Sequence, residues 1–405
     1  MNRKLLIFAV FVLLILSVCC TINKTEEQSV LKSYRTLTPV TVTVDMIDQI
    51  IKDLNYSDFK DNTIRQLIIY PVKVYKITYR TNYKGTDIFA SGAVTIPEMD
   101  GVFPILSFHH GTIFKDSRAP SRYGGGDKME AETAMNIIFG STGFICASPD
   151  LIGYGDSTKE LHPYHLFDPT VKASIDMLRA VKELCVKLGK EVSGQYFLTG
   201  YSEGGYAAMA VQKEIQLNHS DEFPVAAASI GAGAYYLSQT ITGMLNNNTL
   251  ISPAYISFII TAYNEYYGWG RDLSGVFRDP YFSRIYSGIL TGDLFQDQIN
   301  DQLTERSSNL FTNQFLSDFR GSGEEQLKAA LSENNLYSDW SPRVQTRLYH
   351  GSRDNLIPPF NSENAYITFK QAGSGSVEFI SLKRKNHETA IIPFIKATLI
   401  WFNSF

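Results

Sequence analysis

The sequence predicts an α/β protein in which helices flank a mostly parallel central sheet, and in which a large helical insertion interrupts that sheet. Three observations support this fold class. From residue 102 onward, apolar strand-like segments alternate with amphipathic helical segments, as they do in βαβ units. The alternation stops at about residue 235 and resumes at about residue 340. The chain has 405 residues, of which 44% are hydrophobic, so it can bury a large core.

The first predicted elements precede the alternation. Residues 43–54 place apolar side chains at helical spacing, which predicts an amphipathic helix. Residues 68–83 and 88–98 read as two strands, and the turn-forming segment 84–87 between them predicts a β-hairpin.

Buried strands and amphipathic helices then follow in turn. The predicted strands, with the loops that end them, are 102–112, 143–157, 195–200 and 224–233, and the predicted helices between them are 169–188 and 206–217. After the insertion, residues 344–354 and 376–387 resume the strand-loop pattern, and residues 389–402 close the chain as a helix. We therefore expect one α/β domain over residues 41–405.

The insertion, at about residues 235–340, reads as a helical cap or lid. Within it, residues 252–270 are apolar and aromatic on more than one face. Such a helix packs inside the cap, and its aromatic side chains can also line a pocket. We expect Tyr267 and Trp269 to face the substrate, with Tyr263 and Tyr266 as alternatives.

The N-terminus has the pattern of an export signal. Arg3 and Lys4 precede an apolar run over residues 5–18, which is shorter than the ~20 residues of a membrane-spanning helix. The segment Leu-Ser-Val-Cys ending at Cys19 resembles a bacterial lipobox, so Cys19, or Cys20 beside it, is the expected lipidation site.

Residues 1–20 are therefore the expected lipoprotein signal segment, and residues 21–40 the expected polar tether. This pattern predicts an exported cell-envelope lipoprotein whose catalytic domain lies beside a membrane. An uncleaved N-terminal anchor is the alternative.

Composition excludes several classes of function. The formal net charge is −4 and no block of like charges occurs, so nothing favours a nucleic-acid partner. Cys146 and Cys185 lie in apolar segments and are expected to be buried free thiols, with one disulfide as the alternative. Neither CxxC nor HExxH is present, so the sequence predicts no metal site. It does not indicate an oligomeric state.

Ser202 is the candidate nucleophile. It lies in the pattern Gly200-Tyr201-Ser202-Glu203-Gly204, between a buried strand and an Ala-rich helix. The pattern alone is common by chance, but this setting is that of a nucleophile elbow. The two flanking glycines, with Gly205 after them, allow a tight turn that holds the hydroxyl out of the sheet.

His387 is the candidate base, because a serine hydroxyl needs a base within hydrogen-bond reach. Of the histidines after Ser202, only His387 follows a late strand and precedes the final helix. His219 ends the helix after the serine. His350 ends a strand, but no strand-end acid lies between Ser202 and it.

Asp354 is the candidate acid that orients the imidazole. It follows a strand directly, and its distance from His387 in the sequence leaves room for one helix and one strand. Asp339 and Glu363 are the alternatives.

Backbone amides must hold the negative oxygen of the transition state. The amide of Glu203, after the nucleophile, is one expected donor. Gly111 or Thr112, in the loop after an earlier strand, is the expected second donor. Loop residues at strand ends are expected at the pocket rim: His110, Asp150, Tyr154 and Tyr201.

These parts occur in the order typical of the α/β-hydrolase superfamily, which the chain resembles over about residues 68–405 outside the insertion. The segments that carry the resemblance are "HHGT", "SPDLIGYGDS", "GYSEGG", "HGSRDNLIP" and "NH". The "PDLIGYG" segment and the large cap are most similar to bacterial secretory lipases and the Candida lipase A-like esterases. The resemblance implies a serine carboxylic-ester hydrolase that works through an acyl-enzyme without a cofactor.

Two other functions fit the same residues less well. A serine aminopeptidase or oligopeptidase of the same superfamily uses the same three residue types, but no propeller-length domain precedes the hydrolase region. A catalytically silent hydrolase-fold binding lipoprotein would lack one of the three residues, and none is missing.

Overall fold

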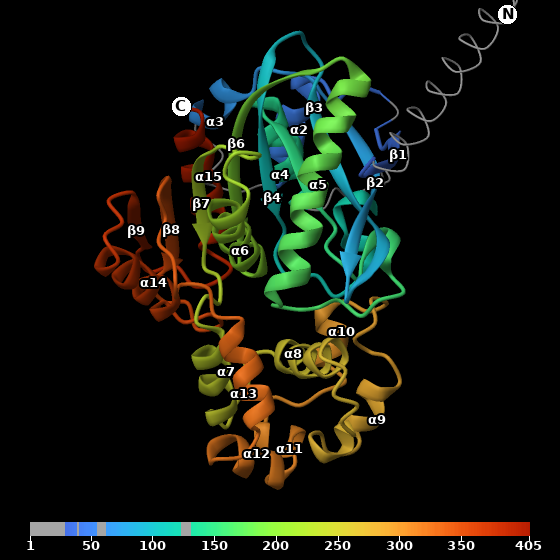
Figure 1. The fold of residues 1–405 in the computed structure, drawn as a ribbon, viewed down its shortest axis with the longest axis vertical. Coiled ribbons are helices and arrows are strands. Elements are labelled where there is room, and N and C mark those ends of the chain that lie inside the picture. Colours follow the sequence, from blue (N-terminus) through green and yellow to red (C-terminus); the bar gives the residue numbers. More distant parts are fainter. Residues whose placement is uncertain (1–28, 39, 55–61, 123–130) are drawn as a thin grey trace, which may run out of the picture.

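The computed structural model describes residues 29–38, 40–54, 62–122 and 131–405. Its centre is a nine-stranded sheet in the order β1-β2-β3-β5-β4-β6-β7-β8-β9 (Figure 1). The strands are β1 (Leu31–Thr36), β2 (Val72–Tyr83), β3 (Thr86–Pro97), β4 (Val102–His109), β5 (Ile145–Pro149), β6 (Glu191–Tyr201), β7 (Val225–Gly231), β8 (Gln345–Gly351) and β9 (Val377–Leu382).

The strands β5, β4, β6, β7, β8 and β9 pair parallel in that order across the sheet. The pairs β1 with β2, β2 with β3, and β3 with β5 are antiparallel. The predicted hairpin is confirmed as β2 and β3, joined by Lys84 and Gly85, both with positive φ. Because the parallel strands all point the same way, the loops after β4, β6, β8 and β9 emerge at one edge of the sheet. These loops carry the candidate catalytic residues.

Helices cover both faces of the sheet. One core joins the sheet to α5 (Phe167–Leu188), α6 (Glu203–Asn218) and α14 (Phe360–Gln371). The other joins it to α2 (Val44–Leu54), α3 (Asn62–Leu67), α4 (Ala131–Ser141) and α15 (Ile391–Phe402). Neighbouring residues of a strand point to opposite faces, and accordingly Leu198 of β6 packs in the first core and Phe197 in the second. The α/β class is confirmed.

The chain between β7 and β8 forms a group of helices with a hydrophobic core of its own (Figure 1). Figure 1 shows this helical insertion gathered at one end of the sheet, below the strands in that view. Its helices are α7 (Leu237–Asn246), α8 (Pro253–Tyr266), α9 (Tyr281–Tyr286), α10 (Gln296–Asn300), α11 (Ser307–Leu310), α12 (Asn313–Arg320) and α13 (Glu325–Glu333).

The predicted polar tether requires a correction, because residues 31–36 form strand β1 at the edge of the sheet. Only Leu31 of this strand is buried, and its other side chains are exposed. An edge strand whose side chains face solvent has no apolar alternation, so the sequence pattern did not reveal it.

Cys146 and Cys185 are buried and free, as expected. The predicted signal segment, with Cys19 and Cys20, lies outside the described residues. Within the described ranges, no helix combines the length and the apolar character needed to cross a membrane.

Leu198 tests the packing of the central sheet. Its side chain is fully buried, so Leu198→Ala removes buried methyl groups and leaves a cavity. We expect the variant to lose about 2–5 kcal/mol of unfolding free energy in urea titrations. Val186→Ala on α5 is the matched control, because Val186 is 81% exposed. Equal effects of the two substitutions would contradict the packing described here.

Candidate active site

Ser202 occupies the turn between β6 and α6 with φ 61° and ψ −121°. This conformation is rare for a residue with a side chain, and it persists only where the surroundings enforce it. The Ser202 amide donates to the Gly231 carbonyl at 2.9 Å, and its carbonyl accepts from the Tyr206 amide at 3.0 Å. The turn is therefore held from β7 and from the first turn of α6.

Glycines let the backbone crowd around this turn. A Cβ on Gly200 would collide with the Gly204 carbonyl, and one on Gly204 would collide with the carbonyl of His109 on β4. Gly205 similarly abuts the carbonyl of Gly231. A side chain at any of these positions would push the helix away from the sheet and move Ser202.

The structure brings Ser202, His387 and Asp354 into one hydrogen-bonded chain. The Ser202 hydroxyl donates to His387 Nε2 at 2.9 Å, and His387 Nδ1–H donates to Asp354 Oδ2 at 2.7 Å. Both distances lie within the range for a nucleophile with its base and for a base with the group that orients it.

Asp354 is buried and fully hydrogen-bonded. Its Oδ1 accepts from the Leu356 and Ile357 amides at 3.0 and 2.9 Å. Burial acts to raise its pKa, but hydrogen bonds from His350 and His387 outweigh this and hold the pKa at about 2. The carboxyl is therefore ionised at neutral pH.

His350 is a second histidine that lies close to Asp354, although the sequence pattern does not favour it as the base. It is completely buried, and its Nε2 lies 2.8 Å from the Ile357 carbonyl and 3.4 Å from Asp354 Oδ2. Since a carbonyl only accepts, Nε2 carries a proton, and Nδ1 lies 2.7 Å from the Ser362 hydroxyl. His350 thus fixes the loop that carries Asp354.

Tyr201 anchors the histidine. Its hydroxyl donates to the backbone carbonyl of His387 at 2.7 Å, and the two rings lie 5.2 Å apart. The residue before the nucleophile therefore helps to place the base.

The loop after β4 carries Gly111 and Thr112, two of the three residues whose amides are expected to hold the oxyanion. A Cβ on Gly111 would lie 3.9 Å from Ser202 Cβ, so this loop passes close to the nucleophile. Among the described atoms, the amides of Gly111, Thr112 and Glu203 have no hydrogen-bond acceptor. Thr112 is fixed through its side chain, which bonds to the Tyr164 hydroxyl at 2.8 Å.

The Glu203 side chain turns away from solvent into a buried pair with His162. His162 Nε2 lies 2.6 Å from Glu203 Oε1, and both side chains are almost completely buried. Burial acts to raise the Glu203 pKa, but the neighbouring imidazoles, His162 above all, bring it below its ordinary value. The sequence does not predict a role for His162, because its local pattern gives no sign that it contacts the helix that follows Ser202.

A cavity of about 420 Å³ opens at Ser202 and His387. Its volume is within the usual range for small-molecule sites. The side chains on one side of it are mostly apolar, and they come from β4, α4 and α15: Phe108, Met135, Ile391, Ile392, Phe394 and Ile395. On the other side lie Ile251, Ser252 and Tyr255 at the start of α8, with Gln296 and Asn300 of α10.

Tyr201, expected at the pocket rim, lines this cavity, whereas the other five residues expected in the pocket do not. Tyr267 and Trp269 stack on each other at 5.3 Å beyond the C-terminal end of α8, whereas the cavity meets its N-terminal end. The predicted helix, α8, does contribute an aromatic side chain to the cavity, but this side chain is Tyr255, about three turns before Tyr267.

The other three expected residues, Asp150, His110 and Tyr154, are buried, and their side chains hydrogen-bond to neighbouring loops. Asp150 accepts from the Ser91 hydroxyl and the Ser121 amide, and burial raises its pKa. His110 bridges the Gly111 and Asp150 carbonyls at 2.7 and 3.1 Å, so it holds the Gly111 loop. Tyr154 donates to the Ile113 carbonyl.

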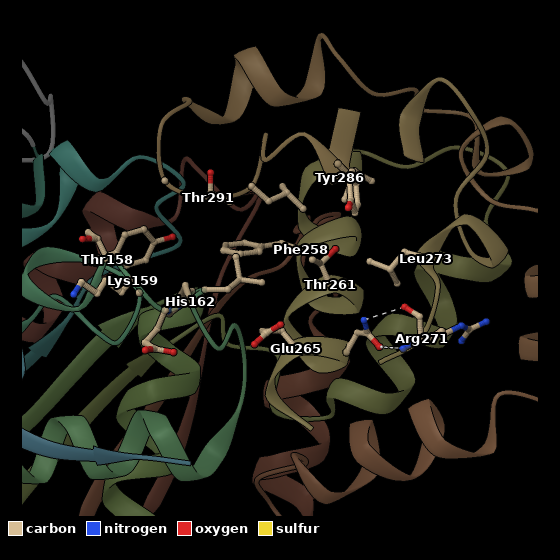
Figure 2. Close-up of a pocket in the computed structure, with 18 of the residues that line it drawn as sticks. Thr158, Lys159, His162, Phe258, Thr261, Glu265, Arg271, Leu273, Tyr286 and Thr291 are labelled. Carbon is tan, nitrogen blue, oxygen red and sulfur yellow. Dashed lines mark hydrogen bonds between the residues drawn. The ribbon is translucent and has the colours of Figure 1, made fainter. Parts of the chain in front are cut away.

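A larger cavity, of about 600 Å³, lies between residues 153–162 and the helical insertion (Figure 2). Figure 2 shows His162 at its sheet-side wall, with Phe258, Thr261 and Glu265 of α8 facing it. Ser202 does not line this cavity. His162 therefore lies between the larger cavity and the residue after the nucleophile.

Within the described ranges, no cluster of three or more His, Cys, Asp or Glu side chains could hold a metal ion.

The sequence model of the secretory lipase family matches residues 129–404. No curated protein sequence matches the chain significantly. Among solved structures, a candidate hydrolase from Legionella pneumophila is 24% identical with a TM-score of 0.81, over 93% of this chain and 98% of that one.

The rice cell wall degrading esterase LipA from Xanthomonas oryzae is 25% identical with a TM-score of 0.80, over 93% of this chain and 97% of that one. Lipase A from Candida antarctica is 15% identical with a TM-score of 0.63, over 89% and 78% of the two chains.

The depressed pKa of Asp354 predicts a pH-dependent contribution to stability. Its folded pKa of about 2 lies below the ordinary value of 3.8, so the contribution is present above about pH 4 and is lost as the pH falls toward 2. In urea titrations, the unfolding free energy of the wild type should fall by about 2 kcal/mol more than that of Asp354→Asn between pH 5 and pH 2. A difference between the two proteins that stays constant over this range would contradict the assignment.

Proposed function

The chain belongs to the secretory lipase family and is a carboxylic-ester hydrolase, and we propose that it is an exported serine esterase that forms an acyl-enzyme on Ser202. The observation that carries this proposal is the hydrogen-bonded chain from Ser202 through His387 to Asp354, located on a strained turn that faces a cavity.

In the first half-reaction, Ser202 Oγ attacks the ester carbonyl carbon while His387 Nε2 takes the hydroxyl proton. Asp354 stabilises the imidazolium that forms. The carbonyl oxygen becomes negative and is held by the amides of Glu203 and of Gly111 or Thr112. His387 then returns the proton to the alcohol oxygen as the C–O bond breaks, which leaves the acyl group on Ser202.

In the second half-reaction, a water molecule takes the place of the alcohol. His387 removes a proton from this water as it attacks the acyl carbon, and the same amides hold the oxyanion. The proton then passes to Ser202 Oγ, and the carboxylic acid is released. The hydroxyl and the imidazole are restored, so no cofactor is consumed.

The cavity supports an ester that is apolar at one end and polar at the other. The apolar side chains of α4 and α15 suit an acyl chain. A second hollow of about 590 Å³ shares Thr112, Gln296 and Asn300 with this cavity, and charged side chains such as Lys115 and Asp297 form part of its lining. There Lys115 Nζ lies 4.2 Å from the centroid of the Phe295 ring. A polar alcohol portion fits this second hollow.

We further assign the helical insertion as a cap, because residues of α8 and α10 line the cavity that contains Ser202. Membership of a secretory family supports export. Attachment to the cell envelope through Cys19 or Cys20 remains a proposal from the sequence alone.

Ser202→Ala tests the nucleophile. We expect the hydrolysis of p-nitrophenyl butyrate to fall by at least about 10⁴-fold, because the remaining groups bind the ester without attacking it. The wild type should be labelled by a fluorophosphonate probe and the variant should not. A wild type that prefers peptide p-nitroanilides, or a variant that keeps full esterase activity, would contradict the proposal.

Ile392→Trp tests the acyl pocket. Ile392 lines the apolar side of the cavity on α15, so the larger indole shortens the space for an acyl chain. We expect kcat/KM to fall about tenfold more for p-nitrophenyl hexanoate than for the acetate. Equal losses with both esters would place the acyl chain elsewhere.

A further inference from the structure

Glu203, which is paired with His162, places an acidic side chain directly beside the nucleophile. Glu203 is 3% exposed, and its amide is the one expected to hold the oxyanion. Its Oε1 is 2.6 Å from His162 Nε2, and its Oε2 has no hydrogen-bond partner among the described atoms. An ionised carboxylate here would oppose the negative oxygen that forms during acyl transfer, unless a positive charge compensates it.

Hydrogen bonding fixes how many protons the pair holds. His162 Nδ1 lies 2.6 Å from the Ile152 carbonyl, which can only accept, so Nδ1 carries a proton. The short contact between Nε2 and Glu203 Oε1 requires one further proton between these two atoms. The pair is therefore neutral as a unit, either as imidazolium and carboxylate or as imidazole and carboxylic acid.

The surroundings favour the ionic form. Aromatic rings enclose His162, with the Tyr154 ring centroid at 4.9 Å, that of Phe258 at 5.7 Å and that of Tyr164 at 5.9 Å, and such rings attract a cation. Glu203 lies in the first turn of α6, where the helix dipole favours a negative charge. The other titratable groups that face Glu203 are His110, His165 and Tyr255, together with the two tyrosines above.

We propose that His162 is a positioning residue for ester hydrolysis: it neutralises Glu203 and anchors the first turn of α6, so that the Glu203 amide can stabilise the oxyanion. This inference rests on the proposed function of Ser202. It also explains how an acidic residue is tolerated beside the nucleophile. His162 joins α6 to the loop at Ile152, and this link holds the Glu203 amide near Ser202.

A double-mutant cycle on p-nitrophenyl butyrate tests the inference. His162→Phe keeps a ring among the aromatic neighbours but leaves Glu203 without a compensating charge, so kcat should fall about 10- to 100-fold with KM changed less than about threefold. Glu203→Gln alone should lower kcat only a few-fold. In the double variant, His162→Phe with Glu203→Gln, kcat should recover about tenfold relative to His162→Phe, since no charge is left uncompensated.

The pH profile separates charge compensation from packing. Without His162, burial raises the pKa of Glu203, so its carboxyl is neutral at lower pH and charged at higher pH. The loss of kcat in His162→Phe should therefore grow as the pH rises, and the double variant should lack this dependence. A loss from packing alone would be the same at every pH and would not be rescued.

Two further variants complete the experiment. His219→Phe, at the far end of α6, is the matched control and should keep the wild-type kcat. If His162→Phe does not fold, His162→Asn takes its place in the cycle, with the same expected rescue. A double variant no faster than the single His162 variant, or a His162 variant within twofold of the wild type, overturns the inference. If the proposed function itself is wrong, the wild type and Ser202→Ala will hydrolyse the ester equally slowly. This result is distinct from a failure of the His162 inference, in which the wild type remains active.

Discussion

The close packing of backbone around the turn between β6 and α6 is the constraint on which the site depends. Gly200 and Gly204 let α6 press against β4 and β6, and this contact forces Ser202 into its strained conformation. Every other part of the site is placed relative to that turn. The loop after β4 brings Gly111 to the nucleophile, and Tyr201 reaches from the same turn to hold the backbone of His387. The strain is maintained because the sheet on one side and the helix on the other leave the turn no room to relax.

Three buried histidines of the site have different hydrogen-bond partners, and these give each a different role. His387 has a carboxylate on one nitrogen and a hydroxyl on the other, which suits it to move a proton. His350 lies between a carbonyl and a hydroxyl, and it supports the Asp354 loop. His162 faces a carbonyl and a carboxylate, and it shares a proton with Glu203. The residue type is the same in each case, and the partner atoms decide what it does.

Local patterns predicted much of the fold and the identity of the central residues. The strand before Ser202, the helix after it and the strand-end position of Asp354 are all encoded in short stretches of sequence, and the structure brings these residues together. Features that depend on contacts across the fold were not accessible in the same way. Strand β1 has no apolar alternation, and His162 meets Glu203 only because the loop after β5 reaches the first turn of α6. The choice of Tyr255 over Tyr267 depends on which end of α8 lies at the Ser202 cavity, which helical periodicity does not specify.

The order of the parts along the chain has a consequence for how activity arises during folding. Ser202 precedes the helical insertion, whereas Asp354 and His387 follow it, so the nucleophile and its base are 185 residues apart. A chain folded only as far as β7 has a serine on its turn but no base to activate it. In the proposed mechanism, hydrolytic competence therefore requires that β8 and β9, with the loops that follow them, join the sheet. On this proposal, a chain that has not reached this stage cannot cleave the esters it meets, and reactivity toward an active-site probe reports that these last strands are in place.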